Sequence, residues 1–179
     1  MLFGCLLFGS VLLHEMGHSL AARKFGINTH SITLYPFGGI ARVAAKHLSP
    51  WEEIVISMAG PLVNLGIVLI SAPFLYFDFP PVAYLIFLNL VMGIFNLFPA
   101  FPMDGGRVLR ATLSHFSGDD IWATAWAIRV SLAIVWSLMA LAAYLLFPML
   151  ILVSVVLHVM LLQEVRRLER RKVLQSIPF

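Results

Sequence analysis

Long apolar runs separated by short polar or proline-rich segments dominate this chain. A helix that spans a membrane needs roughly 20 mostly apolar residues, and five runs approach or exceed that length. These runs cover residues 1–24, 50–77, 82–98, 121–147 and 149–163. The pattern predicts an all-α polytopic membrane protein of about five transmembrane helices, with residues 1–179 forming a single domain.

The segment 27–47 differs from the spans because apolar and polar positions partly alternate within it. Ile32 and Leu34 lie in β-prone sequence, and Pro36 with Gly38 and Gly39 interrupts it. We therefore predict a small membrane-associated β-hairpin. An edge strand within this hairpin could bind an extended peptide by strand addition, and a hairpin that merely covers a neighbouring site is an equally good interpretation.

Two polar segments mark where helices begin or end. Ser49 and Pro50, followed by Glu52 and Glu53, are typical of a helix N-terminus. The segment 99–106, which contains two prolines and two glycines, cannot be a regular helix, and a short helix is expected to follow it.

Composition supports the membrane assignment and argues against two other classes, a water-soluble domain and a nucleic-acid-binding protein. Hydrophobic residues make up 60% of the chain, charged residues 12%, and the mean hydropathy is +0.93, a balance that does not suit a water-soluble domain of this size. The sequence pI of about 9.4 could suggest nucleic-acid binding. The basic residues lie near span ends rather than along one stripe, so no nucleic-acid partner is expected.

Charge also predicts how the chain is oriented. The predicted layout places eleven of the 12 Lys and Arg residues on one side, and the exception, Arg129, lies near enough to a span end to snorkel back. By the positive-inside bias this side is cytosolic, and it includes a basic tail at 164–179. We expect a multi-pass protein of a prokaryotic cell membrane. Because this layout starts outside and directly in a span, we also expect that an upstream helix is missing.

One turn of the first span contains the most concentrated chemistry. His14 and His18 lie four residues apart, so their imidazoles share one helix face, and Glu15 projects beside them. Ionisable residues within a span are costly and usually mark a functional site. Zinc is the natural ion for such a pair, and helix rise places it about 7 to 14 Å from the interface at Arg23.

A catalytic zinc ion usually has three protein ligands, so a third residue must come from elsewhere in the chain. Asp104 is the best candidate because it lies where a span ends in irregular backbone, which is tolerated at membrane depth only in a buried place or beside a cavity. An alternative interpretation is that Asp104 simply caps the short helix that follows.

Together these segments resemble the site-two protease family of intramembrane zinc metalloproteases. The resemblance rests on four motifs: His14-Glu15-Met16-Gly17-His18, Pro36-Phe37-Gly38-Gly39, Ala59-Gly60-Pro61-Leu62, and the segment Asn96 to Gly106 with its Asn-x-x-Pro and Pro-x-Asp-Gly elements. The match to the family extends over most of the chain, from the first of these motifs to the last and beyond. Family members usually have a further span before the zinc helix, and some have regulatory domains that this sequence does not show.

The resemblance implies a function and a set of roles. His14, His18 and Asp104 would bind one Zn²⁺ per chain, Glu15 would be the catalytic base, and Asn96 would steady the substrate or intermediate. The substrate would be a membrane-spanning protein cut in or near its transmembrane segment, with the active site towards the cytosol and a regulator released there.

Two other classes of protein use similar residues. Intramembrane His, Glu and Asp also build proton-coupled or metal-ion transporters, but those show internal repeats, and we find none here. A non-catalytic binding module is less favoured because the candidate base and three candidate ligands are all present.

Overall fold

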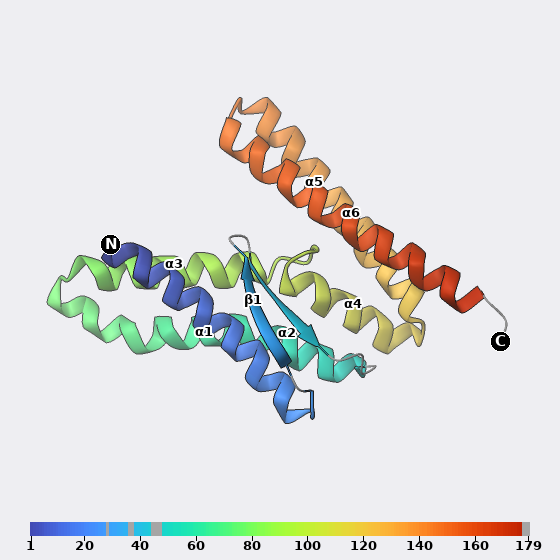
Figure 1. Ribbon diagram of the computed structural model, residues 1–179. Helices are drawn as coiled ribbons and strands as arrows, with labels where there is room; N and C mark the ends of the chain where they lie inside the picture. The colour runs from blue at the N-terminus through green and yellow to red at the C-terminus, as the bar shows by residue number, and fades with distance from the viewer. Residues whose placement is uncertain (28, 36–37, 44–47, 177–179) are drawn as a thin grey trace. The chain divides into compact units, whose positions relative to one another are not determined.

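The computed structural model describes residues 1–27, 29–35, 38–43 and 48–176 (Figure 1). The chain forms two compact units, Met1–Leu97 and Phe98–Phe179. Each unit is described by itself below.

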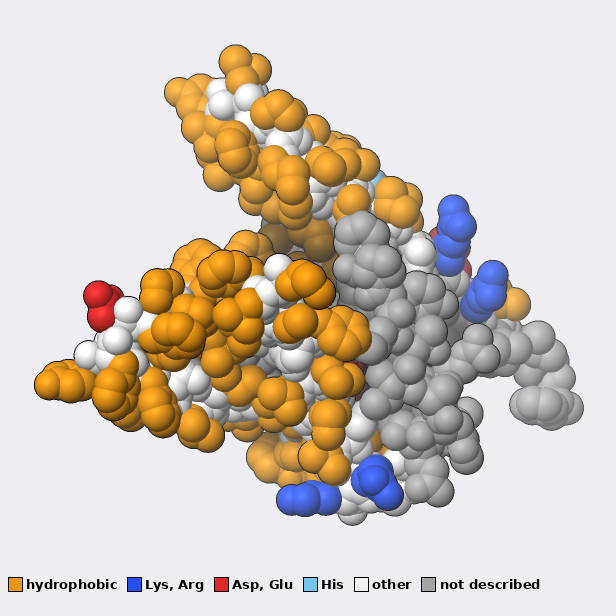
Figure 2. Space-filling model, turned by 60° about the vertical axis from the view of Figure 1, so that its left-hand side comes forward, with side chains coloured by type: hydrophobic (Ala, Val, Ile, Leu, Met, Phe, Trp, Pro, Cys, Tyr) orange, Lys and Arg blue, Asp and Glu red, His pale blue; other side chains and the backbone are white. Residues whose placement is uncertain are grey.

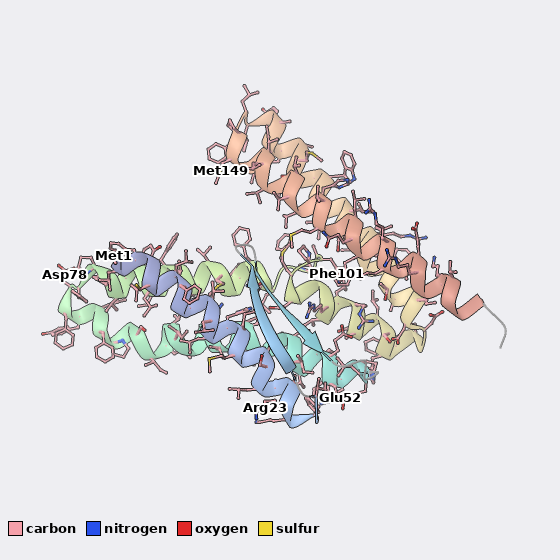
Figure 3. The ribbon with its side chains drawn as sticks, viewed as in Figure 1. Met1, Arg23, Glu52, Asp78, Phe101 and Met149 are labelled. Atoms are coloured by element: carbon pink, nitrogen blue, oxygen red, sulfur yellow. The ribbon has the colours of Figure 1, made fainter. Side chains whose placement is uncertain are left out.

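The first unit is built around three helices that pack against one another. They are α1 (Leu2–Lys24), α2 (Pro50–Ser71) and α3 (Pro80–Asn96), with a 3-10 segment, η1 (Ala72–Phe77), between the last two. In Figure 3, Met1 and Asp78 lie at one end of this unit, and Arg23 and Glu52 lie at the other. The helices α1 and α2 therefore run antiparallel.

Local sequence explains how α2 begins and ends. Ser49 and Glu52 form a capping box, in which the backbone N–H of Ser49 donates to Glu52 Oε2 over 2.8 Å and the Glu52 N–H donates to Ser49 Oγ over 3.3 Å. The helix continues through Pro61. It ends at Ser71, six residues before the predicted limit of the span, because Pro73 lacks a backbone N–H and the segment tightens into η1.

The interior of the first unit is polar, whereas its outer surface is apolar. Ser10, Ser57, Asn64 and Asn89 are all buried, and many large hydrophobic side chains of α1, α2 and α3 are exposed. Figure 2 shows hydrophobic side chains covering most of the described surface on the face that it displays. This distribution suits a protein surrounded by lipid rather than water.

Two antiparallel strands, β1 (Thr29–Tyr35) and β2 (Gly38–Val43), lie within the region for which a hairpin was predicted. Thr33 pairs with Ile40 and Tyr35 with Gly38, and the register shifts between Thr29 and Ile32. Both strands contact α1. The predicted region 27–47 also includes residues 28, 36–37 and 44–47, which lie outside the described residues.

The second unit consists of three helices around a small apolar core. They are α4 (Asp104–Ser117), α5 (Asp120–Tyr144) and α6 (Pro148–Ser176); α5 packs against both of the others. The buried core residues are Phe101, Ala127, Ile128, Val135, Leu161 and Leu168. The helix α6 continues past residue 163, the predicted end of the last span, and through the basic tail as far as Ser176.

Among the described residues, four helical segments are long and apolar enough to cross a membrane: Leu2–Lys24, Pro50–Phe77, Asp120–Tyr144 and Pro148–Arg170. They correspond to four of the five predicted spans. The fifth, predicted at 82–98, is the 17-residue helix α3, which is apolar but shorter.

Candidate metal centre

Two imidazole rings converge on the inner face of α1. His14 is 4% exposed and His18 is partly buried, and their Nε2 atoms lie 3.1 Å apart. The rings meet edge to face, with centroids 4.7 Å apart. The helical spacing of four residues thus brings two nitrogen atoms to one point, as the sequence predicted.

A backbone carbonyl of α2 orients one of these rings. His18 Nδ1 lies 2.8 Å from the carbonyl oxygen of Ile56. A carbonyl oxygen only accepts, so Nδ1 must hold the proton, and in the neutral ring Nε2 then has its lone pair directed towards His14. Histidines that bind metals are commonly held in this way by a bond from their other ring nitrogen.

Gly60 of α2 lies directly against both rings. A Cβ atom at this position would lie 2.3 Å from His18 Nε2 and 2.7 Å from His14 Cε1. These distances are far below van der Waals contact, so only glycine leaves room for the two imidazoles.

Gly17 on α1 lies equally close to α2, since a Cβ there would lie 2.9 Å from the Ala59 carbonyl oxygen and 2.8 Å from Val63 Cγ2. Close approach of α1 and α2 therefore depends on both glycines.

This pair fits a zinc ion by its chemistry and its spacing. Two nitrogen ligands at tetrahedral zinc are each about 2.0–2.1 Å from the ion, which places them about 3.3 Å from each other. The 3.1 Å between the Nε2 atoms is close to that value. Neutral imidazoles with a fixed tautomer are suitable zinc donors.

Asp104 belongs to the second unit, where it is the first residue of α4 and is buried at 8% exposure. Met103 occupies the N-cap position and makes no capping bond with its side chain. Asp104 is therefore not the N-cap residue that the alternative interpretation proposed. A carboxylate in the first turn of a helix is stabilised by the positive end of the helix dipole.

The irregular segment before Asp104 is held firmly within its own unit. The backbone N–H of Phe101 donates to Ser131 Oγ over 2.8 Å, and this hydroxyl donates to the Ala127 carbonyl over 2.7 Å. Ser131 is fully buried on α5. Gly106 permits the tight turn, since a Cβ there would lie 2.5 Å from the Ala100 carbonyl carbon and the Phe101 nitrogen.

The remaining predicted residues belong to the first unit. Glu15 is partly buried on α1, directly after His14. Asn96 is the last residue of α3 and is partly buried, and its Nδ2 donates to the Met92 carbonyl over 3.0 Å. An amide nitrogen has two N–H groups, so one remains for a further acceptor.

Sequence reasoning missed what Gly60 and Ser131 do. Gly60 entered the sequence analysis only as a member of the motif Ala59-Gly60-Pro61-Leu62, and Ser131 had no part in it. The position of Gly60 beside Pro61 within a span was an available signal. For Ser131 there was none, because a serine in an apolar helix usually bonds only to its own helix.

Comparison with known proteins places these features in a family. A family model described as peptidase family M50 matches residues 2–81 and 78–138. A zinc metalloprotease of Methanocaldococcus jannaschii is 48% identical over 120 residues, covering 63% of this chain and 34% of that protein. A Synechocystis protein named as a zinc metalloprotease is 35% identical over 144 residues, covering 77% of this chain and 38% of that protein.

A solved structure is similar as well. The site-2 protease from Methanocaldococcus jannaschii has 37% sequence identity and a TM-score of 0.75, over 91% of this chain and 77% of that one. The apolar helices, the converging histidine pair and this structural match define a membrane metalloprotease fold. The chain belongs to peptidase family M50, the site-2 protease family. It spans little more than a third of the length of the two curated relatives.

Proposed function

We propose that this chain is a zinc-dependent intramembrane endopeptidase that hydrolyses a peptide bond in or near a transmembrane segment of a membrane-anchored protein. The observation that most directly supports this is the convergence of His14 and His18 Nε2, 3.1 Å apart, in the interior of a unit whose outer surface is apolar. The family assignment favours hydrolysis over the transporter interpretation.

The proposed metal site holds one zinc ion per chain, bound by His14, His18 and Asp104. The histidine pair supplies two converging nitrogens, and the Ile56 carbonyl holds one ring in the tautomer that zinc requires. Asp104 adds a charged oxygen ligand, and its anchored segment restricts where this carboxylate can lie. In this proposal residues 1–179 form a single protease domain.

The proposed reaction uses two further side chains of the first unit. When bound, zinc supplies an acidified water molecule and a positive charge beside the scissile carbonyl. Glu15 accepts the proton of the attacking water and delivers it to the leaving nitrogen, so that the amine departs neutral. Asn96 donates its second amide N–H to the carbonyl oxygen as negative charge develops there.

The site is proposed to lie towards the cytosolic side of a prokaryotic cell membrane. Arg23 and Lys24 end α1 one to two turns beyond His18, and basic residues are favoured on the cytosolic side. Arg129, the basic residue predicted within a span, has its guanidinium 5.0 Å from the centre of the Trp126 ring. This cation–π contact stabilises the charge where it lies.

Zinc analysis and cleavage of a reconstituted membrane-anchored substrate test the proposal together. We expect about one zinc ion per chain, loss of cleavage after chelation, and recovery on adding zinc. His14→Ala should fail to recover, because one of its nitrogen donors is gone. Cleavage that persists in fully metal-free protein would contradict the assignment.

A further inference from the structure

A second layer of buried polar residues lies next to the histidine pair. Ser10 precedes His14 by four residues on α1, and Asn64 follows Gly60 by four residues on α2, so each lies one helical turn from the histidine layer on the same helix face. Because α1 and α2 run antiparallel, both lie towards the end marked by Met1 and Asp78 in Figure 3.

The third member of this layer comes from α3. Asn89 is 1% exposed, and its Nδ2 donates to Ser10 Oγ over 2.9 Å and to the Leu85 carbonyl over 2.8 Å. Asn64 faces the same helix one turn further on, since a Cβ atom added at Gly93 would lie 3.5 Å from Asn64 Cβ. We call Ser10, Asn64 and Asn89 the polar layer. It lies wholly within the first unit.

Hydrogen bonding in the polar layer is incomplete among the described residues. Asn64 is fully buried, and neither its Nδ2 nor its Oδ1 has a hydrogen-bond partner there; Asn89 Oδ1 also lacks one. Native proteins rarely leave a buried amide without a partner, because the group then bears the full cost of losing its contacts with water. Some other group must satisfy these atoms.

The chemistry of the unsatisfied atoms identifies that group. They comprise one NH₂ donor and two carbonyl acceptors. A cation would satisfy only the two oxygens and an anion only the nitrogen, whereas water both donates and accepts. Gly93 leaves space beside the Asn64 amide, since a Cβ there would lie 3.5 Å from Asn64 Cβ and 3.9 Å from its Nδ2.

We propose that the polar layer is an internal hydration site, in which one water molecule or a short chain of them bonds to Asn64 and to Asn89 Oδ1. On α1 the site lies about one turn from His14 and about two turns from His18, on the side away from Arg23. It depends neither on metal binding nor on catalysis, so its test and the test of the proposed function can fail separately. It would place exchangeable water in the interior of a unit with an apolar outer surface.

A structure of the wild-type chain in lipid nanodiscs, at a resolution that shows ordered water, tests the site without any variant. We expect density within hydrogen-bond distance of Asn64 Nδ2 or Oδ1, with a second contact to Asn89 Oδ1. The proposal would be overturned if the Asn64 amide is bonded to a protein group. It would also be overturned if no water density lies beside this amide in a map that shows other buried water molecules. Density with the short contacts of a bound cation would overturn it too.

Thermal unfolding of Asn64→Leu, a replacement of similar volume, provides a second measurement. If water bonds to both amides, Asn64→Leu and Asn89→Leu should each lower Tm, and the double variant should lose less than the sum. If no water molecule bonds to the Asn64 amide, Asn64→Leu should instead raise Tm, because it removes a buried amide that has no hydrogen-bond partner. Ser154→Ala is the matched control, since this buried serine bonds only to the Leu150 carbonyl of its own helix in the described contacts.

Discussion

At the scale of single residues, the candidate site depends on the absence of a Cβ atom at Gly60 as well as on the side chains of His14 and His18. Gly60 presents only backbone to the two imidazoles, and a single methyl group would overlap His18 Nε2. Because α2 also supplies the Ile56 carbonyl that holds His18, the helix orients one ring and makes room for both. Gly60 thus contributes space for the two rings and no ligand atom.

Gly60→Ala should therefore lower zinc affinity by about 10- to 100-fold or more, as loss of a supporting contact does at other metal sites. The reason is steric, since the added Cβ occupies the space of the two ring edges. Zinc titration of the purified protein measures this effect.

Gly66→Ala is the matched control on the same helix, because a Cβ there meets nothing within 4 Å. It should retain zinc and gain up to about 1 kcal/mol in stability from helix propensity. Equal zinc affinity in the two variants would contradict the steric role of Gly60.

Sequence alone predicted the residues whose side chains can bind a metal or accept a proton. It missed Gly60, which matters because it has no side chain. His14 and His18 were predictable because a spacing of four on a helix fixes their relation before any tertiary contact exists. The part played by Gly60 depends on which residues of another helix lie opposite it. That information is absent from local spacing.

At the scale of elements, the segment before Asp104 shows how irregular backbone is held in place within an apolar unit. Its Phe101 N–H is bonded to Ser131, which lies 30 residues away on α5. The predicted break in regular helix at 99–106 is confirmed as far as Met103, and α4 begins at Asp104. Proline and glycine made the break predictable, whereas the helix that anchors it was not.

Ser131→Ala should destabilise the second unit by about 1–3 kcal/mol, because the buried Phe101 N–H loses its acceptor. If Asp104 binds zinc, the same change should weaken zinc binding through the loosened segment. Thermal unfolding and zinc titration together separate the two effects. Ser154→Ala serves again as the control, and a Ser131→Ala variant that matches it in both measurements would refute the anchoring role.

Element boundaries were less predictable than element types. The predicted span 50–77 is an α-helix only to Ser71, because Pro73 changes the hydrogen-bond pattern of its last turns. The last helix extends beyond the predicted span of 149–163, because its basic end remains helical after the apolar run ends. The proposed binding of substrate at an edge of β1 or β2 remains a prediction.

At the scale of the whole molecule, the central property is an apolar outer surface with charge gathered at the ends of spans. In the first unit, Asp78 lies at one end and Arg23 at the other (Figure 3). Hydropathy predicted the apolar surface from sequence, because it depends on composition along the chain rather than on tertiary contacts. The orientation that the positive-inside bias predicts remains a prediction.

Cysteine labelling tests the proposed orientation. The single cysteine, Cys5, is exposed, so it is first replaced by serine. In intact cells an impermeant maleimide should label Asp78→Cys, whereas Ser117→Cys should be labelled only after the membrane is opened. The opposite pattern would reverse the orientation and place the site near the outer side.

The most direct test of the central claim compares wild type with Glu15→Gln for both zinc content and peptide cleavage. Gln keeps the size and polarity of Glu15 but cannot accept the proton of the attacking water. We predict that zinc remains at about one ion per chain while cleavage falls by about 10²- to 10⁴-fold, the usual contribution of general acid–base catalysis. Unimpaired cleavage by Glu15→Gln would contradict the proposed mechanism.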